Sequence, residues 1–192
     1  LNSGNYSFDI NTSSIGSINF SSLRGVAYNG EFFALGETDN KNIYIWKGIP
    51  GLNDEPDYII QNPVGVGRID MNDEWLVVSA YPGAGSPVHV INLTNLDSGI
   101  MLPVPGNDDF PQGVSINEKG FFIALQGSNK VVGWSSVQDA LNGSSPTMSF
   151  GGTTNKTNSG TKMASTVHWD GFHLWVGEFK FSNRLLGFAP SK

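Results

Sequence analysis

The sequence repeats one pattern four times, and this repeat constrains the fold more than any other feature of the chain. In each repeat, two short β-forming runs flank a turn that begins with Asn or Asp, a combination typical of a β-hairpin. These turn residues are Asn29, Asn72, Asn117 and Asp170, at steps of 43, 45 and 53 residues. A third apolar run follows each pair, at residues 43–46, 88–91, 131–134 and 185–188, and a weaker fourth run follows the first three pairs, at residues 57–60, 100–104 and 147–150.

Four antiparallel strands in each unit of about 40 to 50 residues are typical of a β-propeller blade. The middle runs are continuously apolar, as expected for strands that are buried between two neighbouring blades. A β-sandwich also has many short strands, but it would not give four in-phase repeats with a common turn. We therefore predict an all-β propeller of four-stranded antiparallel blades, with four blades in this chain or, alternatively, part of a larger six- to eight-bladed ring. Four tryptophans fall on repeat positions and are expected in the core between blades, namely Trp46, Trp75, Trp134 and Trp175.

The repeat makes residues 1–192 a single propeller domain. Residues 1–22 form an N-terminal arm, and the blades are expected at about residues 23–63, 64–109, 110–160 and 161–192. The fourth repeat has three strands and no outer strand. An isolated β-forming segment at residues 5–10, with Tyr6–Ile10 as its strand, is expected to pair beside residues 185–188 and so to close the ring.

Composition excludes several classes of protein. Because the chain has no cysteine, it has no disulfide, no thiolate zinc site and no cysteine nucleophile. The formal net charge of −6 argues against a nucleic-acid partner, since phosphate backbones are bound by basic surfaces. No apolar run approaches the roughly 20 residues that a membrane span needs.

The chain carries six Asn-x-Ser/Thr sequons, which are candidate glycosylation sites. Together with the scarcity of lysine and the acidic balance, they favour an extracellular or cell-surface protein. The chain begins at Leu1 rather than Met, as expected of a processed chain or a fragment. The sequons lie at Asn5, Asn11, Asn19, Asn92, Asn142 and Asn155.

Two segments resemble the NHL-type propeller repeat. The family pattern is a turn with Asn and a basic residue, a Val/Ile strand that ends in Trp, a Pro-containing loop and the outer strand. The matching residues are 39–50 with 55–60, and 128–134 with 145–147; residues 183–188 match more loosely, and the second repeat departs with Ser86-Pro87 in place of the Asn-basic pair. The resemblance implies a ring with six blades more often than four, in a family that includes binding scaffolds and a few enzymes.

A propeller directs its innermost strands toward the central axis, so a ligand site is expected there. Two arginines that enter from one face could hold an anionic group. The structural alternative is that these side chains simply fill a narrow axis. Alignment of the repeats gives the axial ligand candidates as Arg24, Arg68 and Gln112 at the entry, with Asp70, Ser115 and His168 deeper.

Candidates for catalysis and for metal binding are few. Gly-x-Ser-x-Gly is absent, and His168 and His173 fall in a hairpin rather than on a helix that would place them one turn apart. The acidic loops around Asp54, Asp70 and Asp108 lack the spacing of a dedicated calcium loop. We expect no metal site and no cofactor, with calcium as the one ion to consider.

The leading interpretation is an extracellular, non-enzymatic propeller that acts as an interaction or structural module. Its partner would be a protein or a carbohydrate. The N-terminal segment could also pair with the open blade of a second copy, which would build oligomers. The rival interpretation is a hydrolase or lyase that acts on sugars or lactones, with its site at the axis near His168, Asp70 and Arg68.

Overall fold

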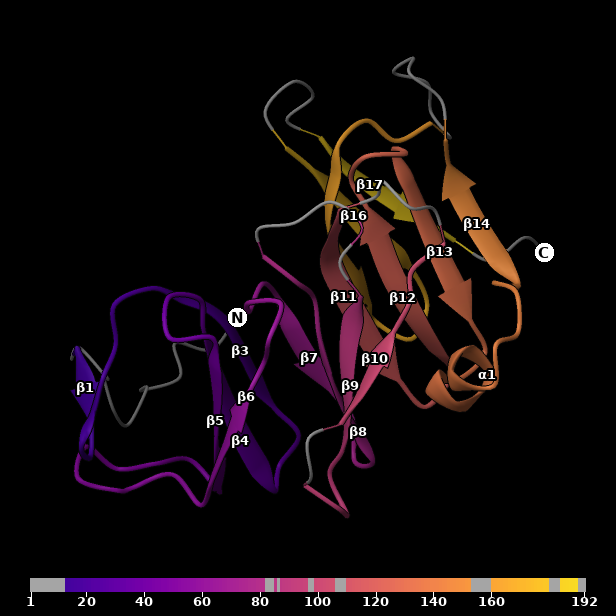
Figure 1. The fold of residues 1–192 in the computed structure, drawn as a ribbon. Coiled ribbons are helices and arrows are strands. Elements are labelled where there is room, and N and C mark those ends of the chain that lie inside the picture. The colour runs from indigo at the N-terminus through magenta and orange to yellow at the C-terminus, as the bar shows by residue number, and fades with distance from the viewer. Residues whose placement is uncertain are drawn as a thin grey trace, which may run out of the picture.

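The structure is a computed structural model that describes residues 13–81, 85, 87–96, 99–105, 110–152, 160–179 and 184–189. It is a β-propeller of four antiparallel sheets, in which the strands of each sheet follow one another in chain order (Figure 1). The fold class that the repeat predicts is thereby confirmed. The predicted closing strand, Tyr6–Ile10, lies outside the described residues.

The strands of each blade fall where the repeat places them. The first blade contains β3 (Leu23–Tyr28), β4 (Phe32–Glu37), β5 (Asn42–Lys47) and β6 (Tyr58–Gln61). The second contains β7 (Ile69–Met71), β8 (Trp75–Val78), β9 (Val88–Asn92) and β10 (Ile100–Leu102). The third contains β11 (Pro111–Asn117), β12 (Gly120–Leu125), β13 (Lys130–Trp134) and β14 (Met148–Gly151). The fourth contains β15 (Ala164–Trp169), β16 (Leu174–Glu178) and β17 (Leu185–Phe188).

The recurring Asn closes the turn between the first two strands. In blade 1, the side-chain oxygen of Asn29 accepts hydrogen bonds from the backbone N–H groups of Glu31 and Phe32, at 3.0 and 2.7 Å. Short polar side chains favour such turns because they satisfy backbone donors locally. The amide nitrogen of Asn29 then donates to the backbone oxygen of Asn72 in blade 2, at 2.9 Å. One residue type therefore both closes the hairpin and ties it to the next blade.

Each sheet buries both of its faces where it has two neighbours. Three apolar clusters lie between consecutive blades and hold them together. They are centred on Ile45 and Leu76 between blades 1 and 2, on Val90 and Ile123 between blades 2 and 3, and on Ala124 and Val176 between blades 3 and 4. This two-sided burial explains why the middle strands are continuously apolar instead of alternating.

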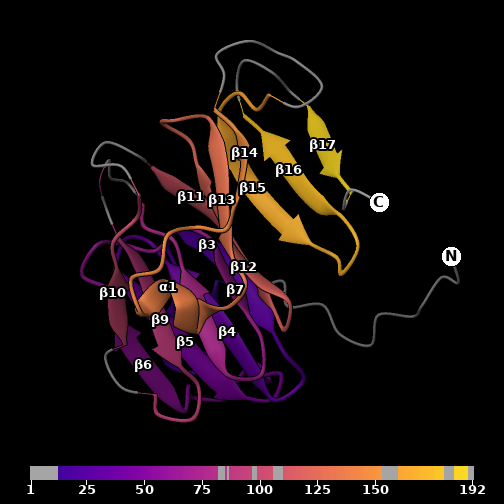
Figure 2. The same cartoon turned by 90° about the vertical axis from the view of Figure 1, so that its right-hand side faces the viewer.

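The blades follow an arc whose two ends remain apart. Among the described strands, β3 packs against β7, β7 against β11 and β11 against β15, whereas no pair between blade 4 and blade 1 is packed in this way. Blade 1 and blade 4 lie at opposite ends of the arc in both views (Figure 1 and Figure 2). As a result, in the described part of the chain, one face of blade 1 and one face of blade 4 have no neighbouring blade.

A small hairpin covers part of the free face of blade 1. It consists of β1 (Ser14–Ile15) and β2 (Ile18–Asn19) and lies within the predicted N-terminal arm. Ile15 is fully buried against the middle strands of blade 1, in a cluster with Tyr44 and Trp46. The hairpin turn is held by Glu55, whose carboxylate accepts from the Ser17 backbone N–H at 2.6 Å and from its hydroxyl at 2.7 Å.

One short helix, α1 (Val137–Leu141), interrupts the loop between β13 and β14. The repeat does not predict it. Ser136 caps its N-terminus by accepting a hydrogen bond from the Asp139 backbone N–H, and the hydroxyl donates in return to the Asp139 carboxylate. Val137 and Ala140 are buried against the core between blades 2 and 3.

Candidate functional site

Three of the six axial candidates occupy equivalent places on the innermost strands. Asp70, Ser115 and His168 each precede the turn residue of their blade by two positions, and Ala27 takes the same place in blade 1. The structure brings Asp70 and Ser115 together through a hydrogen bond between their side chains.

Asp70 joins two blades. One carboxylate oxygen accepts from the backbone N–H of Met71 at 3.0 Å, and the other accepts from the backbone N–H of Ile116 in blade 3 at 2.9 Å. Burial raises the pKa of Asp70 above its ordinary value, and these hydrogen bonds together with the Ser115 hydroxyl offset only part of that effect. The carboxylate therefore serves backbone donors.

Ser115 repeats the arrangement one blade further on. Its hydroxyl oxygen is buried and accepts from the backbone N–H of Trp169 in blade 4 at 3.1 Å. Its proton is directed to Asp70. His168, in contrast, lies exposed at the end of the series, and no hydrogen bond joins it to Asp70 or Ser115 among the described residues. This geometry is that of an inter-blade contact rather than of an activated serine.

The entry positions are likewise engaged in contacts between blades. The guanidinium of Arg24 lies over the ring of Tyr81, 3.6 Å from its centroid, and the guanidinium of Arg68 donates to the backbone oxygen of Arg24 at 3.3 Å. The backbone oxygen of Gln112 accepts from the buried hydroxyl of Ser79 at 3.0 Å. The Arg68 guanidinium thus lies at the Arg24 backbone, and the guanidinium of each arginine already has a partner.

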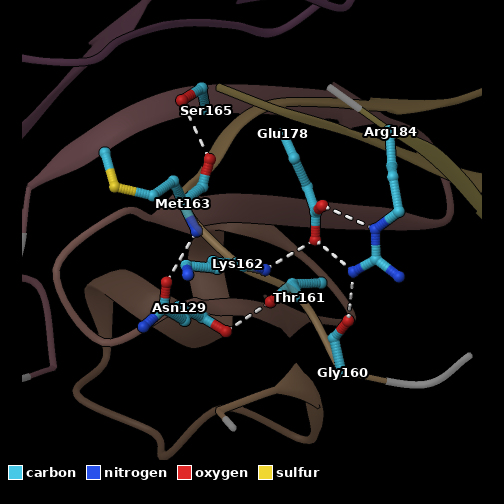
Figure 3. A network of polar contacts seen from close by, with 8 residues as sticks. All are labelled: Asn129, Gly160, Thr161, Lys162, Met163, Ser165, Glu178 and Arg184. Carbon is cyan, nitrogen blue, oxygen red and sulfur yellow. Dashed lines mark hydrogen bonds and ion pairs between the residues drawn. The ribbon is translucent and has the colours of Figure 1, made fainter. Parts of the chain in front are cut away.

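A polar network holds the segment that leads into β15, the first strand of blade 4 (Figure 3). Arg184 binds both oxygens of Glu178, at 2.8 Å each, and donates to the backbone oxygen of Gly160 at 3.0 Å. The hydrogen bond with Glu178 raises the pKa of Arg184. Across the network, Asn129 of blade 3 accepts from the backbone N–H of Met163 at 2.6 Å. The network ties the segment before the first strand of blade 4 to β16 and to blade 3.

An apolar groove lies on the free face of blade 1. It has a volume of about 350 Å³ and runs between the N-terminal hairpin and the innermost strand β3. Its exposed members stand out: Val26 is 61 % exposed and Leu23 is 45 % exposed. Its lining residues are Ile15, Phe20, Leu23, Arg24, Gly25, Val26, Phe33 and Leu35.

Sequence reasoning missed this groove, although one signal was present. Val26 aligns with Ile69, Val114 and Val167, which are all buried against the preceding blade. Only the position of blade 1 at the end of the arc leaves Val26 uncovered. The N-terminal hairpin adds the second wall, because Ile15 and Phe20 lie beside it.

The sequons have different surroundings. Asn19 and Asn142 are exposed, on the N-terminal hairpin and at the C-terminal end of α1. Asn92 is half-buried, and its side-chain oxygen accepts from the backbone N–H and hydroxyl of Thr94. Asn5, Asn11 and Asn155 lie outside the described residues.

The acidic loops serve local backbone contacts. Asp54 accepts from the backbone N–H of Gly51 at 2.8 Å, and Asp57 accepts from that of Lys47 at 2.7 Å. In the part of the chain that the structure describes, no three His, Asp or Glu side chains gather closely enough to hold a metal ion. Asp108 lies outside that part. Within the same part, none of the helices has the length and apolar character that crossing a membrane requires.

The fold and these contacts define a four-bladed β-propeller with an uncovered blade face. Neither protein-family models nor the sequences of curated proteins match the chain. Its fold resembles that of the computationally designed Ika4 protein, with a TM-score of 0.61 at 9 % identity over 94 % of this chain and 98 % of that one.

Two further solved structures share the fold. A chain in a nidogen/laminin complex gives a TM-score of 0.65 at 12 % identity over 88 % of this chain, and the designed Ika8 protein gives 0.59 at 11 % identity over 92 %. This chain spans 60 % of the first and 48 % of the second. At such identities the likeness concerns the fold alone.

Proposed function

We propose that the chain is a protein-interaction module that binds a protein partner through the uncovered face of blade 1. The observation that carries this proposal is the apolar groove in which Val26 and Leu23 are exposed beside the buried Leu35. Exposed apolar residues that form a connected patch, rather than scattered single ones, are a mark of an interaction site. The occurrence of the same fold in a nidogen/laminin complex supports a protein partner.

The groove also favours a particular kind of partner. Its walls are aliphatic and aromatic, while Arg24 supplies one cation at the rim, held over Tyr81. An apolar side chain next to a carboxylate or carbonyl group would match this combination. A carbohydrate partner fits this groove less well, because sugar hydroxyls need several polar groups.

The module is further proposed to be extracellular, glycosylated and non-enzymatic. Exposure of Asn19 and Asn142 supports glycan attachment, and the scarcity of lysine supports an extracellular or cell-surface location. The use of Asp70 and Ser115 in inter-blade hydrogen bonds supports the non-enzymatic interpretation over an axial hydrolase or lyase. Membership of the NHL-type family is a proposal that rests on the turn and strand pattern. Mass spectrometry of the natural protein tests the glycans.

The binding proposal is tested by recovery of partners with matched variants. The tagged chain, Val26→Asp and Lys119→Asp are incubated with the extracellular fraction of the source, and the retained proteins are identified. Lys119 is exposed on a turn of blade 3, away from the groove. We expect a protein that the wild-type chain and Lys119→Asp retain and Val26→Asp loses, with at least tenfold weaker binding in calorimetry of the purified pair. Retention of the same proteins by Val26→Asp would contradict the proposal.

A further inference from the structure

The free faces of blades 1 and 4 are the two halves of one recurring interface. Between consecutive blades, the face that carries Asp70 or Ser115 packs against the face that carries Val114 or Val167 of the next blade. In blade 4, the first of these faces carries His168, and in blade 1 the second carries Val26. Val114 and Val167 are 4 % and 7 % exposed, whereas Val26 is 61 % exposed.

The hydrogen bonds across this interface follow a rule. Asp70 accepts from the backbone N–H of Ile116, and Ser115 accepts from that of Trp169, which stands at the equivalent place. By the same spacing, His168 should accept from the N–H of Tyr28. The bond from Asn29 N–H to Phe32 O makes Tyr28 and Phe33 a non-hydrogen-bonded pair of the β3–β4 ladder, so the Tyr28 N–H points away from β4.

Close backbone approach defines which residues face each other. A Cβ on Gly25 would lie 2.8 Å from the side chain of Ile69, and one on Gly113 would lie 3.0 Å from the backbone nitrogen of Val167. In blade 4, Thr166 stands at the place of Gly25 and Gly113, and it is exposed. Its counterpart on a following blade would be Val26.

We propose that blade 4 of one chain docks onto blade 1 of a second copy, so that the innermost strands repeat the contact between consecutive blades, with Thr166 against Val26 and His168 at the Tyr28 backbone. This inference rests on the proposed binding face of blade 1 and names its partner. Leu185, which is 68 % exposed on the outer strand of blade 4, adds apolar surface to the docking face. Docking of this head-to-tail kind repeats along an assembly.

A second copy fits better than closure within one chain. The two free faces lie at opposite ends of the arc, and the N-terminal hairpin covers Leu35, Tyr44 and Trp46 on the blade 1 side. The hairpin leaves Leu23 and Val26 on β3 exposed, so the docking contact lies on that strand. The assembly that follows uses two blade faces, unlike the strand pairing through residues 5–10 that the sequence predicts.

Engineered cysteines test this arrangement directly, because the chain has none of its own. Val26→Cys and Thr166→Cys are purified as separate variants, mixed under mild oxidation and analysed by non-reducing gel electrophoresis. We expect the mixture to form a covalent dimer at least tenfold faster than either variant alone. The double variant should form a ladder of oligomers. A control mixture of Val26→Cys with Ser149→Cys, which is exposed on β14, should stay mainly monomeric.

Three outcomes would overturn the inference. Closure within one chain would give the double variant an internal disulfide and a monomeric mass. Symmetric docking of two blade 1 faces would cross-link Val26→Cys alone as fast as the mixture. Equal cross-linking in the control mixture would mean random collision.

Two aspartate substitutions, one on each docking face, provide an independent measurement. Val26→Asp and Leu185→Asp should each be monomeric in analytical ultracentrifugation. Their 1:1 mixture should form a dimer, because Val26→Asp keeps an intact blade 4 face and Leu185→Asp keeps an intact blade 1 face. This dimer cannot extend, since its two remaining faces carry the substitutions. If neither the mixture nor the wild-type chain forms dimers, the inference is overturned. A monomeric wild type that still binds a different protein through Val26 would leave the proposed function intact, so the two proposals fail separately.

Discussion

At the scale of single residues, polar side chains on the innermost strands join one blade to the next. Ser115 is the most constrained of them, because its buried hydroxyl serves Trp169 N–H as an acceptor and Asp70 as a donor. Ser115→Ala should lower the free energy of unfolding by about 1–3 kcal/mol, since it removes the acceptor of the part-buried Trp169 N–H and the donor to Asp70. Urea denaturation measures this loss. Ser149→Ala, on exposed β14, is the control, and an equal loss in both variants would contradict the role of Ser115.

Glu37 makes stability depend on pH at the same scale. Burial raises the pKa of Glu37, but hydrogen bonds from Ser21, Asn40 and the backbone outweigh it and hold the pKa below the ordinary value of 4.5. The folded state therefore binds this proton less readily than the unfolded state. The stability from Glu37 is present above pH 4.5 and is lost as the pH falls through the lowered value.

We therefore expect Glu37→Gln to flatten the fall in unfolding free energy below pH 4.5. Glu31→Gln, an exposed carboxylate of the same blade, is the control and should leave the slope as in wild type. Asp70 acts with the opposite sign, because its raised pKa favours the folded state in acid. An unchanged slope in Glu37→Gln would show that its hydrogen bonds do not persist in solution.

At the scale of elements, Asn29 in the hairpin of blade 1 has two separable roles. Asn29→Asp keeps the oxygen that closes the turn but loses the donor to Asn72, whereas Asn29→Ala loses both. The first change should cost about 1 kcal/mol for one hydrogen bond, and the second should cost about 1 kcal/mol more. Thermal unfolding of the two variants separates these contributions. Equal costs would show that the turn contact contributes nothing.

In blade 4, an Asp stands in place of the Asn and keeps only the role of closing the turn. The turn residue is Asp170, whose oxygen accepts from the backbone N–H groups of Phe172 and His173. Its other oxygen accepts from the indole nitrogen of Trp175 at 2.8 Å, and these bonds lower the pKa of Asp170. A carboxylate has no donor with which to reach a following blade. Blade 4 therefore keeps the same turn as the other repeats. The side-chain donor to a following blade is missing in blade 4, where the arc ends.

The strands could be predicted from sequence because every repeat carries the same turn and the same apolar middle runs. The N-terminal hairpin could not, since its strands have two residues each and Ile15 becomes buried only against Tyr44 and Trp46. Helix α1 had a usable signal, because Ser136 and Asp139 have the spacing of a capping box. Its five residues were too few to give a helical period.

At the scale of the whole molecule, position along the arc decides what a repeat position does. Trp134 lies between blades 2 and 3 as predicted, while the equivalent Trp46 packs under the N-terminal hairpin. Val26 and Val167 are alike in sequence and differ only in having a neighbour. The candidate groove depends on this difference, which no local pattern encodes. For the axial candidates, the sequence predicts their equivalent positions in the repeat. Their role as inter-blade contacts could not be predicted, because it depends on how the blades pack together.

The arc also predicts a gradient of local stability. Blades 2 and 3 are covered on both faces, whereas blade 4 has one covered face and three described strands. In repeat architectures, stability follows the number of neighbours. In dilute solution, amide hydrogen exchange should therefore be slowest in β8, β9, β12 and β13 and at least tenfold faster in β15 and β17. Mass spectrometry of exchanged peptides measures this. Exchange in β15 as slow as in β12 under dilute conditions would mean that the free face of blade 4 is covered within the chain, and a slowing that grows with protein concentration would mean that a second copy covers it.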